Sequence, residues 1–128
     1  MVIYAKDLER VSRFYAELLG LSAVDARVGD FASLGSADGD LELSIVAIPD
    51  HTAGAIVISE PPERRERAAM KPSFAVDNLH AVRRRAPELG GAVDDAATEW
   101  SWRGMVHCDG NDPEGNVFQL RTDDPVHR

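Results

Sequence analysis

The first half of the chain opens with a short apolar strand pattern at residues 2–5 and continues as a helix. Apolar residues then recur every three or four positions, which is the spacing of one helix face. Asp7 is a suitable N-cap for this helix and Gly20 a suitable stop. Turn residues divide the stretch that follows into three alternating strand patterns. The predicted helix face comprises Leu8, Val11, Phe14, Tyr15, Leu18 and Leu19, and the predicted strands cover residues 21–28, 31–34 and 41–46.

The same order of elements returns in the second half of the chain. A strand pattern at residues 71–76 leads to the cap residue Asn78 and to a second helix, which Gly90-Gly91 ends. The two helices align at a constant offset of 71 residues, which places Leu79 on Leu8. Further strands are predicted at residues 92–97, 99–109 and 116–121. A repeat of this length is too long for a solenoid unit, so we interpret it as two βαβββ modules within one α+β domain.

Prolines mark irregular backbone in two places. Pro87 lies inside the second predicted helix and should kink or shorten its last turn. Between the modules, residues 55–58 are predicted as a strand or a short helix, and Pro61-Pro62 followed by ERRER indicates an exposed linker. The predicted boundaries are about 1–47 for module one, about 48–70 for the linker, about 71–122 for module two and 123–128 for a tail. This linker is long enough for two chains to exchange modules, so we expect a homodimer.

Composition and charge narrow the classes of partner. The 128 residues suffice for one domain without disulfides, and a net charge of −8 argues against nucleic acid. The basic clusters at Arg64-Arg65, Arg67 and residues 83–85 lie among acidic residues, as on a solvated face. No apolar stretch is long enough to cross a membrane, no export signal is evident, and the single Cys108 fits a reducing compartment. We therefore expect a cytoplasmic protein with no membrane partner.

The most specific motif is the turn Asp112-Pro113-Glu114-Gly115-Asn116 between two strand patterns. Pro113 presets φ at an early turn position, and Gly115 and Asn116 accept positive φ readily. This hairpin resembles the closing hairpin of the vicinal oxygen chelate superfamily, which includes glyoxalases, bleomycin-resistance proteins, extradiol dioxygenases and fosfomycin-resistance enzymes. The opening stretch IYAKDLERVSRFYAELLGL is similar to the family's first strand and helix. The resemblance covers essentially the whole chain and implies curled mixed sheets that enclose a cleft.

Alternation along the strands sorts their residues into two faces. We expect the core face to cover the helices, and the cleft implied by the resemblance raises the opposite face above an ordinary solvated surface. The predicted core residues are Ile3, Ala5, Leu41, Leu43, Ile45, Phe74, Val76, Phe118 and Leu120. The polar residues predicted on the cleft face are Tyr4, Glu42, Ser44, Lys71, Ser73, Gln119 and Arg121.

The metal site of the superfamily is not carried over. Its metalloenzymes place a His, Glu, His, Glu ligand set in four strands. By resemblance the first ligand would precede Met1, the second matches Glu42, and the third and fourth fall on Lys71 and Gln119. An ammonium only donates hydrogen bonds and repels a cation, so we expect no metal and no cofactor. Lys71 would instead pair with Glu42 or face a ligand.

Histidine and aromatic residues supply further candidates. His51, His80 and His127 show no metal-ligand spacing; His107 either faces the cleft or is an ordinary strand residue, which we favour. Cys108 is predicted to be a small buried residue. Trp100 and Trp102 share one strand face, where they wall a pocket, anchor a dimer interface or belong to the core.

These residues support one leading functional hypothesis and two rivals. The first is a metal-free small-molecule-binding protein similar to bleomycin-resistance proteins, with Glu42, Lys71 and Gln119 as polar contacts and the two tryptophans as an apolar wall. The second is a metal-dependent lyase, isomerase or dioxygenase that uses Glu42, Gln119 and His107. The third is metal-free acid or base catalysis. Neither the ligand nor a reaction can be identified from the sequence.

Overall fold

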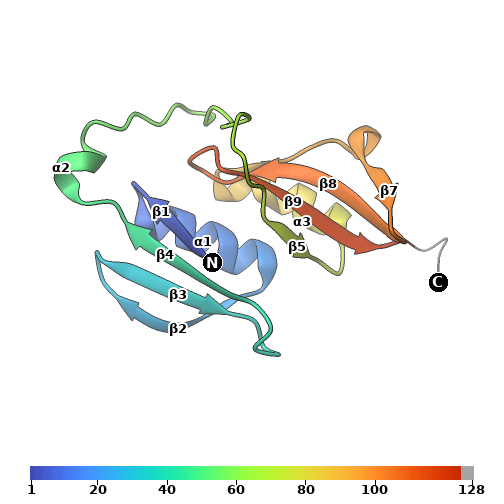
Figure 1. Cartoon of the computed structure of the whole chain (residues 1–128), viewed down its shortest axis with the longest axis horizontal. Helices are drawn as coiled ribbons and strands as arrows, with labels where there is room; N and C mark the ends of the chain where they lie inside the picture. The colour runs from blue at the N-terminus through green and yellow to red at the C-terminus, as the bar shows by residue number, and fades with distance from the viewer. Residues whose placement is uncertain (125–128) are drawn as a thin grey trace. The chain divides into compact units, whose positions relative to one another are not determined.

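The computed structural model describes residues 1–124, which form two compact units (Figure 1). The first unit covers Met1–Glu60 and the second begins at Pro61. His127 and the rest of the predicted tail beyond residue 124 lie outside the described residues. Within residues 1–124, no helix is both long and apolar enough to cross a membrane.

The first unit is a four-stranded mixed sheet with a helix on one face. Its elements are β1 (Val2–Ala5), α1 (Leu8–Leu19), β2 (Ser22–Arg27), β3 (Phe31–Gly35), β4 (Glu42–Ala47) and a short α2 (Asp50–Ala53). The strands lie in the order β1-β4-β3-β2, with β1 and β4 parallel and the other pairs antiparallel. This is the predicted strand–helix–three-strand unit.

The helix α1 forms where its caps and its apolar spacing predict. Asp7 caps its start by accepting a hydrogen bond from the backbone N–H of Arg10, and Gly20 ends it in a left-handed conformation with φ of 67°. Its buried residues Val11, Phe14, Tyr15 and Leu18 are in the core together with Leu43 and Ile45 of β4. Burying each of these larger side chains contributes about 1.5–3 kcal/mol, so packing rather than helix propensity fixes the element.

The second unit repeats this topology. Its elements are β5 (Ser73–Ala75), α3 (Leu79–Arg85), the 3₁₀ helices η1 (Ala86–Leu89) and η2 (Ala96–Thr98), and the strands β6 (Ala92–Val93), β7 (Trp100–Trp102), β8 (Met105–Asn111) and β9 (Val117–Asp123). The order β5-β9-β8-β6 matches β1-β4-β3-β2 position for position, and β5 and β9 are parallel as β1 and β4 are. The internal repeat read from the sequence is therefore confirmed at the level of strand order.

The second helix changes form at its proline. The α-helix ends at Arg85, and residues Ala86–Leu89 continue as a 3₁₀ helix with Pro87 in its first turn. Proline removes one backbone donor and clashes with a preceding carbonyl in an α-helix, whereas the first turn of a new helix tolerates it. The predicted shortening of the last α-helical turn is confirmed.

The prediction of one strand over residues 99–109 is wrong. The chain instead reverses between β7 and β8, where Arg103 and Gly104 both have positive φ, 53° and 77°. Two central residues with positive φ are typical of a tight hairpin turn, whose usual sequence is Asn-Gly or Asp-Gly. An arginine in the first position conceals that signal.

Two other predicted elements also differ. The strand predicted at 92–97 is only the two-residue β6, after which η2 begins, and residues 55–58 form neither strand nor helix. The short helix near them, α2, lies earlier in the chain. Short elements of this kind depend on tertiary contacts more than on local pattern.

The turn between β8 and β9 is held by hydrogen bonds to one buried carboxylate. The fully buried Asp112 carboxylate accepts hydrogen bonds from the backbone N–H of Glu114 and Asn116 and from the Asn116 side chain, at 2.9–3.0 Å. Gly115 has φ of 85°, and a Cβ atom there would lie 2.0 Å from the Glu63 carbonyl oxygen. Glycine is required here by both conformation and space.

Candidate ligand-binding site

The sheet of the second unit has one buried face and one polar and aromatic face. Phe74, Phe118, Leu120 and Cys108 are buried at no more than 4% exposure, as predicted for the face toward α3. The alternate residues lie in register across the strands, because Ser73 pairs with Gln119 and Gln119 with Asp109. In the next row Arg121 pairs with His107, and His107 with Trp100. Alternation therefore gathers the predicted residues of β5, β7, β8 and β9 on one face.

A chain of hydrogen bonds links three of these strands. Arg121 donates to the hydroxyl of Ser73 at 2.9 Å, and that hydroxyl donates to Oε1 of Gln119 at 3.3 Å. The same amide oxygen lies 3.0 Å from Nδ1 of His107. The amide of Gln119 is therefore held on two sides, from β5 and from β8.

His107 is engaged through both of its ring nitrogens. It is only 3% exposed, and its Nε2 lies 3.1 Å from the backbone carbonyl of Trp102. A carbonyl only accepts hydrogen bonds, so Nε2 carries a proton. Nδ1 faces Oε1 of Gln119 at 3.0 Å. Both ring nitrogens are therefore engaged, and neither remains free for a metal ion.

The two tryptophans and His107 form what we call the aromatic shelf. The ring of Trp100 stacks on His107 at 5.6 Å between centroids and 16° between planes, and Trp102 lies 5.6 Å from His107 at 49°. Trp100 is 38% exposed and Trp102 58% exposed, so the shelf presents indole surface to solvent over a buried support. The core assignment for these tryptophans is excluded, and the pocket-wall and interface assignments stay open.

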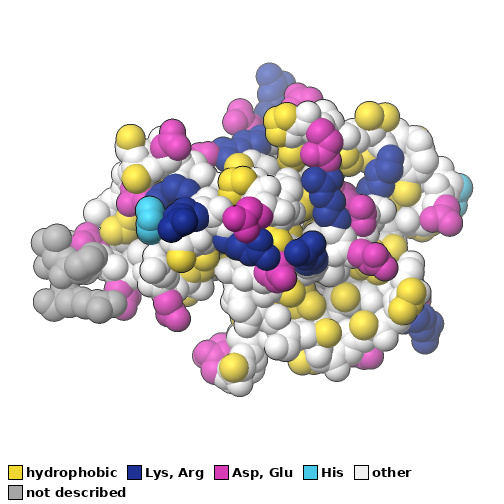
Figure 2. All heavy atoms as spheres, turned by 180° about the vertical axis from the view of Figure 1, so that it is seen from behind, with side chains coloured by type: hydrophobic (Ala, Val, Ile, Leu, Met, Phe, Trp, Pro, Cys, Tyr) yellow, Lys and Arg dark blue, Asp and Glu magenta, His cyan; other side chains and the backbone are white. Residues whose placement is uncertain are grey.

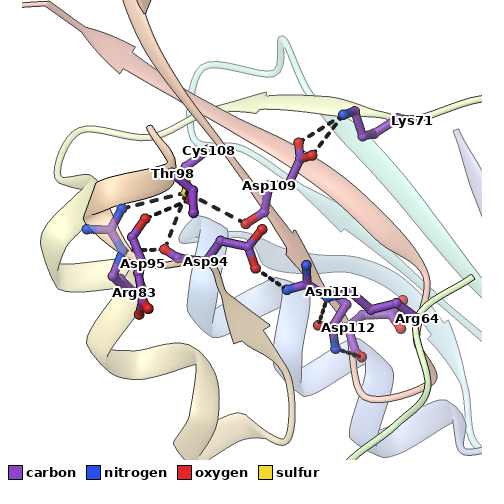
Figure 3. Close-up of polar contacts among 10 residues, drawn as sticks. All are labelled: Arg64, Lys71, Arg83, Asp94, Asp95, Thr98, Cys108, Asp109, Asn111 and Asp112. Atoms are coloured by element: carbon purple, nitrogen blue, oxygen red, sulfur yellow. Dashed lines mark hydrogen bonds and ion pairs between the residues drawn. The ribbon is translucent and has the colours of Figure 1, made fainter. Parts of the chain in front are cut away.

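Beside the aromatic shelf lies an ion pair that the sequence did not single out. The ammonium of Lys71 donates to both carboxylate oxygens of Asp109, at 2.9 and 3.0 Å (Figure 3). It also lies 5.8 Å from the centroid of the Trp100 ring. The sequence analysis expected Lys71 to pair with Glu42 or to face a ligand, whereas the observed partner, Asp109, belongs to the same unit as Lys71. Strand alternation could have identified Asp109 as a residue of this face, because Asp109 follows His107 by two positions on β8.

A second polar cluster fixes the start of β7 from the opposite side. Arg83 of α3 donates to the backbone carbonyl of Asp94 at 2.7 Å and forms an ion pair with Glu99, and its guanidinium also contacts the buried Sγ of Cys108 at 3.7 Å. Burial acts to lower the pKa of Arg83, but the hydrogen bonds with Cys108 and Glu99 outweigh it and the pKa is raised. These bonds anchor the residue immediately before Trp100.

The three candidate residues of the first unit share the outer face of their own sheet. Tyr4 is 65% exposed, Glu42 is exposed, and the half-buried Ser44 shares a 2.9 Å hydrogen bond with Ser33. Their core neighbours Ile3, Ala5, Leu43 and Ile45 are buried as predicted. That these residues join those of the second unit in one cleft stays a prediction.

Two of the residues at the family's metal positions, Lys71 and Gln119, do not suit a metal ion, whereas the third, Glu42, is an exposed carboxylate. Lys71 is an ammonium paired with Asp109, and the Gln119 amide is already held by Ser73 and His107. A divalent ion would need neutral or anionic donors that are free to turn toward it. Among residues 1–124, no group of three or more His, Cys, Asp and Glu side chains could hold a metal ion.

Comparisons with known proteins agree with this fold. The sequence matches the family model of the glyoxalase-like domain over residues 1–121, so the chain belongs to the glyoxalase-like family of the vicinal oxygen chelate superfamily. A search of curated proteins found no match.

Three solved structures show how far the likeness extends. A glyoxalase/bleomycin resistance protein/dioxygenase family enzyme from Burkholderia phytofirmans PsJN is 18% identical with a TM-score of 0.69, over 97% of this chain and 96% of that one. The fosfomycin resistance protein FosX from Listeria monocytogenes is 14% identical with a TM-score of 0.65, over 100% and 93%. TnmS3, an antibiotic binding protein from Streptomyces sp. CB03234, is 22% identical with a TM-score of 0.63, over 97% and 93%. At these identities the likeness establishes the fold.

Proposed function

We propose that this protein binds a small organic molecule against the aromatic shelf of its second unit and does so without a metal ion. The observation that carries the proposal is the pair of exposed indoles supported by a buried, fully hydrogen-bonded His107. Large exposed aromatic side chains on a rigid base are typical of ligand sites, because little side-chain entropy is lost on binding.

The polar groups around the aromatic shelf support recognition more than catalysis. Lys71, Asp109 and Gln119 each already have a partner, so they offer oriented donors and acceptors instead of an unpaired reactive group. Sequestration of a ligand needs affinity and orientation only. The names of TnmS3 and FosX mention antibiotic binding and fosfomycin resistance, which makes antibiotics the first class of ligand to screen.

Intrinsic fluorescence tests the proposal directly. The chain contains only two tryptophans and both belong to the aromatic shelf, so selective tryptophan excitation reports on this site alone. We expect flat aromatic compounds from an antibiotic and metabolite library to quench or shift this emission saturably. Trp100→Leu should weaken binding at least tenfold, a loss of about 1.4 kcal/mol, whereas Val28→Ala on an exposed position of the first unit should not change it.

Two outcomes would reject the proposal. One is a library in which no compound perturbs either tryptophan. The other is stoichiometric Zn, Ni, Mn or Fe in protein purified without chelator and lost in Glu42→Ala, which would establish the metal-dependent lyase, isomerase or dioxygenase alternative.

We further propose that two copies of the chain pair and that the protein acts in a reducing compartment such as the cytoplasm. An apolar part of the outer face of the first sheet supports pairing, because Val2 and Tyr4 are exposed and Tyr4 is in register with Val46, which pairs with Phe31. The free, buried thiol of Cys108 supports the compartment. Light scattering should give twice the mass of one chain, and a monomer at all concentrations would contradict the pairing.

A further inference from the structure

Next to the aromatic shelf, residues 63–71 cross one end of the same sheet face and line a half-open cavity of about 350 Å³. We call this segment the strap. The strap is largely exposed, as the sequence predicted for this linker, and it also forms one wall of the cavity. Asp94, Asp109 and Val117 form another wall. A cavity of this size is at the lower end of the range that small ligands occupy.

The strap is fixed at both ends. Near its start the backbone N–H of Arg65 donates to the Gly115 carbonyl at 2.9 Å, and Arg64 donates to the Asn111 side chain at 2.7 Å. At its other end Lys71 is paired with Asp109. Figure 3 shows Arg64 reaching the Asp94 carboxylate and Lys71 reaching that of Asp109. The cavity is therefore built by specific bonds and is not a gap beneath a loose loop.

The charges of the cavity wall balance. Arg64 and Asp94 form one ion pair at 2.6 Å, and Lys71 and Asp109 form another at 2.9 Å. Arg65 and Glu66 add one charge of each sign. Partly exposed ion pairs of this kind contribute little net stability, so a ligand can exchange with one partner at small cost. A ligand with a single charge would leave a wall group unpaired, whereas a ligand that carries both charges satisfies both members of a pair.

The position of Lys71 connects this cavity to the aromatic shelf. Its ammonium lines the cavity through the pair with Asp109 and also lies 5.8 Å from the Trp100 ring centroid. A ligand whose charged group exchanges with the Lys71–Asp109 pair would therefore place its adjoining part beside Trp100.

We propose that the strap cavity is a subsite for a zwitterionic group, with a carboxylate directed to Lys71 and an amine directed to Asp109, and that the ligand's aromatic part lies on the aromatic shelf. The ligand class is then an aromatic α-amino acid or a larger molecule that carries one. This inference rests on the proposed function for its aromatic part and deepens it by naming the charged part.

A matched series of small probes tests the charge requirement. The probes are L-phenylalanine (zwitterion), L-phenylalaninamide (cation), 3-phenylpropanoate (anion) and glycine (zwitterion without a ring). Binding is measured on the whole chain by ¹H–¹⁵N NMR, following the backbone signals of Arg65 and Asp109 for the cavity and the indole signals for the shelf. We expect L-phenylalanine to bind about fivefold more tightly than either singly charged probe and to shift both sets of signals.

Removing the charge of Asp109 and removing that of Lys71 should change the preference among the charged probes in opposite directions. Asp109→Asn leaves a net positive wall, so 3-phenylpropanoate should bind as tightly as L-phenylalanine or more tightly. Lys71→Met leaves a net negative wall, so the preference should move toward L-phenylalaninamide. Asp25→Asn, on an exposed strand of the first unit, changes the net charge of the chain by the same amount as Asp109→Asn and should leave the order of the probes unchanged. Peak dispersion in the free spectra checks that each variant is folded.

The outcomes separate this inference from the proposed function. If the three aromatic probes shift the indole signals with equal affinity and the Arg65 and Asp109 signals stay fixed, the subsite is rejected while binding at the shelf stands. If glycine and L-phenylalanine shift the cavity signals alone, the subsite stands and the shelf is rejected as a ligand surface. If no probe shifts either set of signals, the zwitterion subsite is rejected.

Discussion

At the scale of single residues, His107 determines much of the surface above it. Its ring supports both tryptophans, and its two nitrogens bond the Trp102 carbonyl and the Gln119 amide. A residue of this kind affects ligand binding without touching the ligand, because it orients the groups that do.

Substituting His107 separates its support of the rings from its hydrogen bonds. His107→Phe keeps an aromatic ring under the tryptophans but removes the partner of the Trp102 carbonyl and one of the two partners of the Gln119 amide, so we expect a loss of about 1–3 kcal/mol in the free energy of unfolding. His107→Ala removes the ring as well and should be less stable than His107→Phe. Denaturant unfolding measures stability, and the near-ultraviolet circular dichroism of the tryptophans reports their packing.

One result for these two variants would contradict a supporting role for His107. If His107→Phe is as stable as the parent protein and His107→Ala retains the parent's tryptophan spectrum, His107 is an ordinary strand residue, as the sequence analysis favoured.

The sequence predicted which residues share a face of a strand, but it did not predict which side chains pair with each other across strands. Alternation placed Ser73, Gln119 and Arg121 together because period two is a property of the strand itself. The pairing of Lys71 with Asp109 depends on which strands become neighbours and in what register, which no local pattern specifies. Trp100 and Trp102 had several open assignments for the same reason.

At the scale of elements, the strap and the β8–β9 turn depend on each other. The turn supplies the carbonyl that binds Arg65, and Gly115 leaves the space that Glu63 occupies. The sequence predicted the turn from its residue types but treated residues 61–70 as a solvated linker, since a charged, proline-containing stretch gives no sign of a tertiary contact.

Replacing Gly115 should detach the strap. In Gly115→Ala the new methyl group would clash with the Glu63 carbonyl, so residues 63–65 must move away. The alanine would also have a positive φ, which is unfavourable for any residue with a Cβ atom. Gly29→Ala is the matched control, because Gly29 also has positive φ (77°) but nothing within 4 Å of the added atom. The control should cost only about 1–2 kcal/mol for backbone conformation.

Limited digestion with trypsin measures this effect, since the strap contains Arg64, Arg65 and Arg67. We expect faster cleavage there in Gly115→Ala and an unchanged rate at these sites in Gly29→Ala. Equal cleavage of the two variants would show that the strap is not held by the turn.

The hairpin of β7 and β8 could not be predicted from the alternation of apolar and polar residues. Residues 99–109 alternate as one long strand would, and only the backbone conformation of Arg103 and Gly104 reveals the reversal. That reversal places Trp100 opposite His107 in the observed register, so the aromatic shelf could not be assembled from the sequence.

At the scale of the whole molecule, acidic residues outnumber basic ones, 22 to 14. Figure 2 shows Lys and Arg side chains lying beside Asp and Glu side chains on the face in view, with no uninterrupted positive surface. Together with the net charge of −8, this agrees with the expectation that nucleic acid is not a partner.

Removal of divalent ions provides a prediction for the complete chain. Because Lys71 and the held Gln119 amide do not suit a metal ion, dialysis against EDTA should leave the melting temperature and the binding of L-phenylalanine unchanged. A drop of several degrees that added Zn²⁺ or Mn²⁺ restores would contradict the metal-free proposal.

The two units share a strand order, yet the aromatic shelf and the neighbouring Lys71–Asp109 ion pair both belong to the second unit. A duplicated architecture permits one copy to specialise in ligand binding while the other serves folding and the proposed pairing of two chains. Evolution of a new preference would then be confined to a few outward positions of β7, β8 and β9, with both helix-facing cores left intact. Libraries for directed evolution can be restricted to those positions.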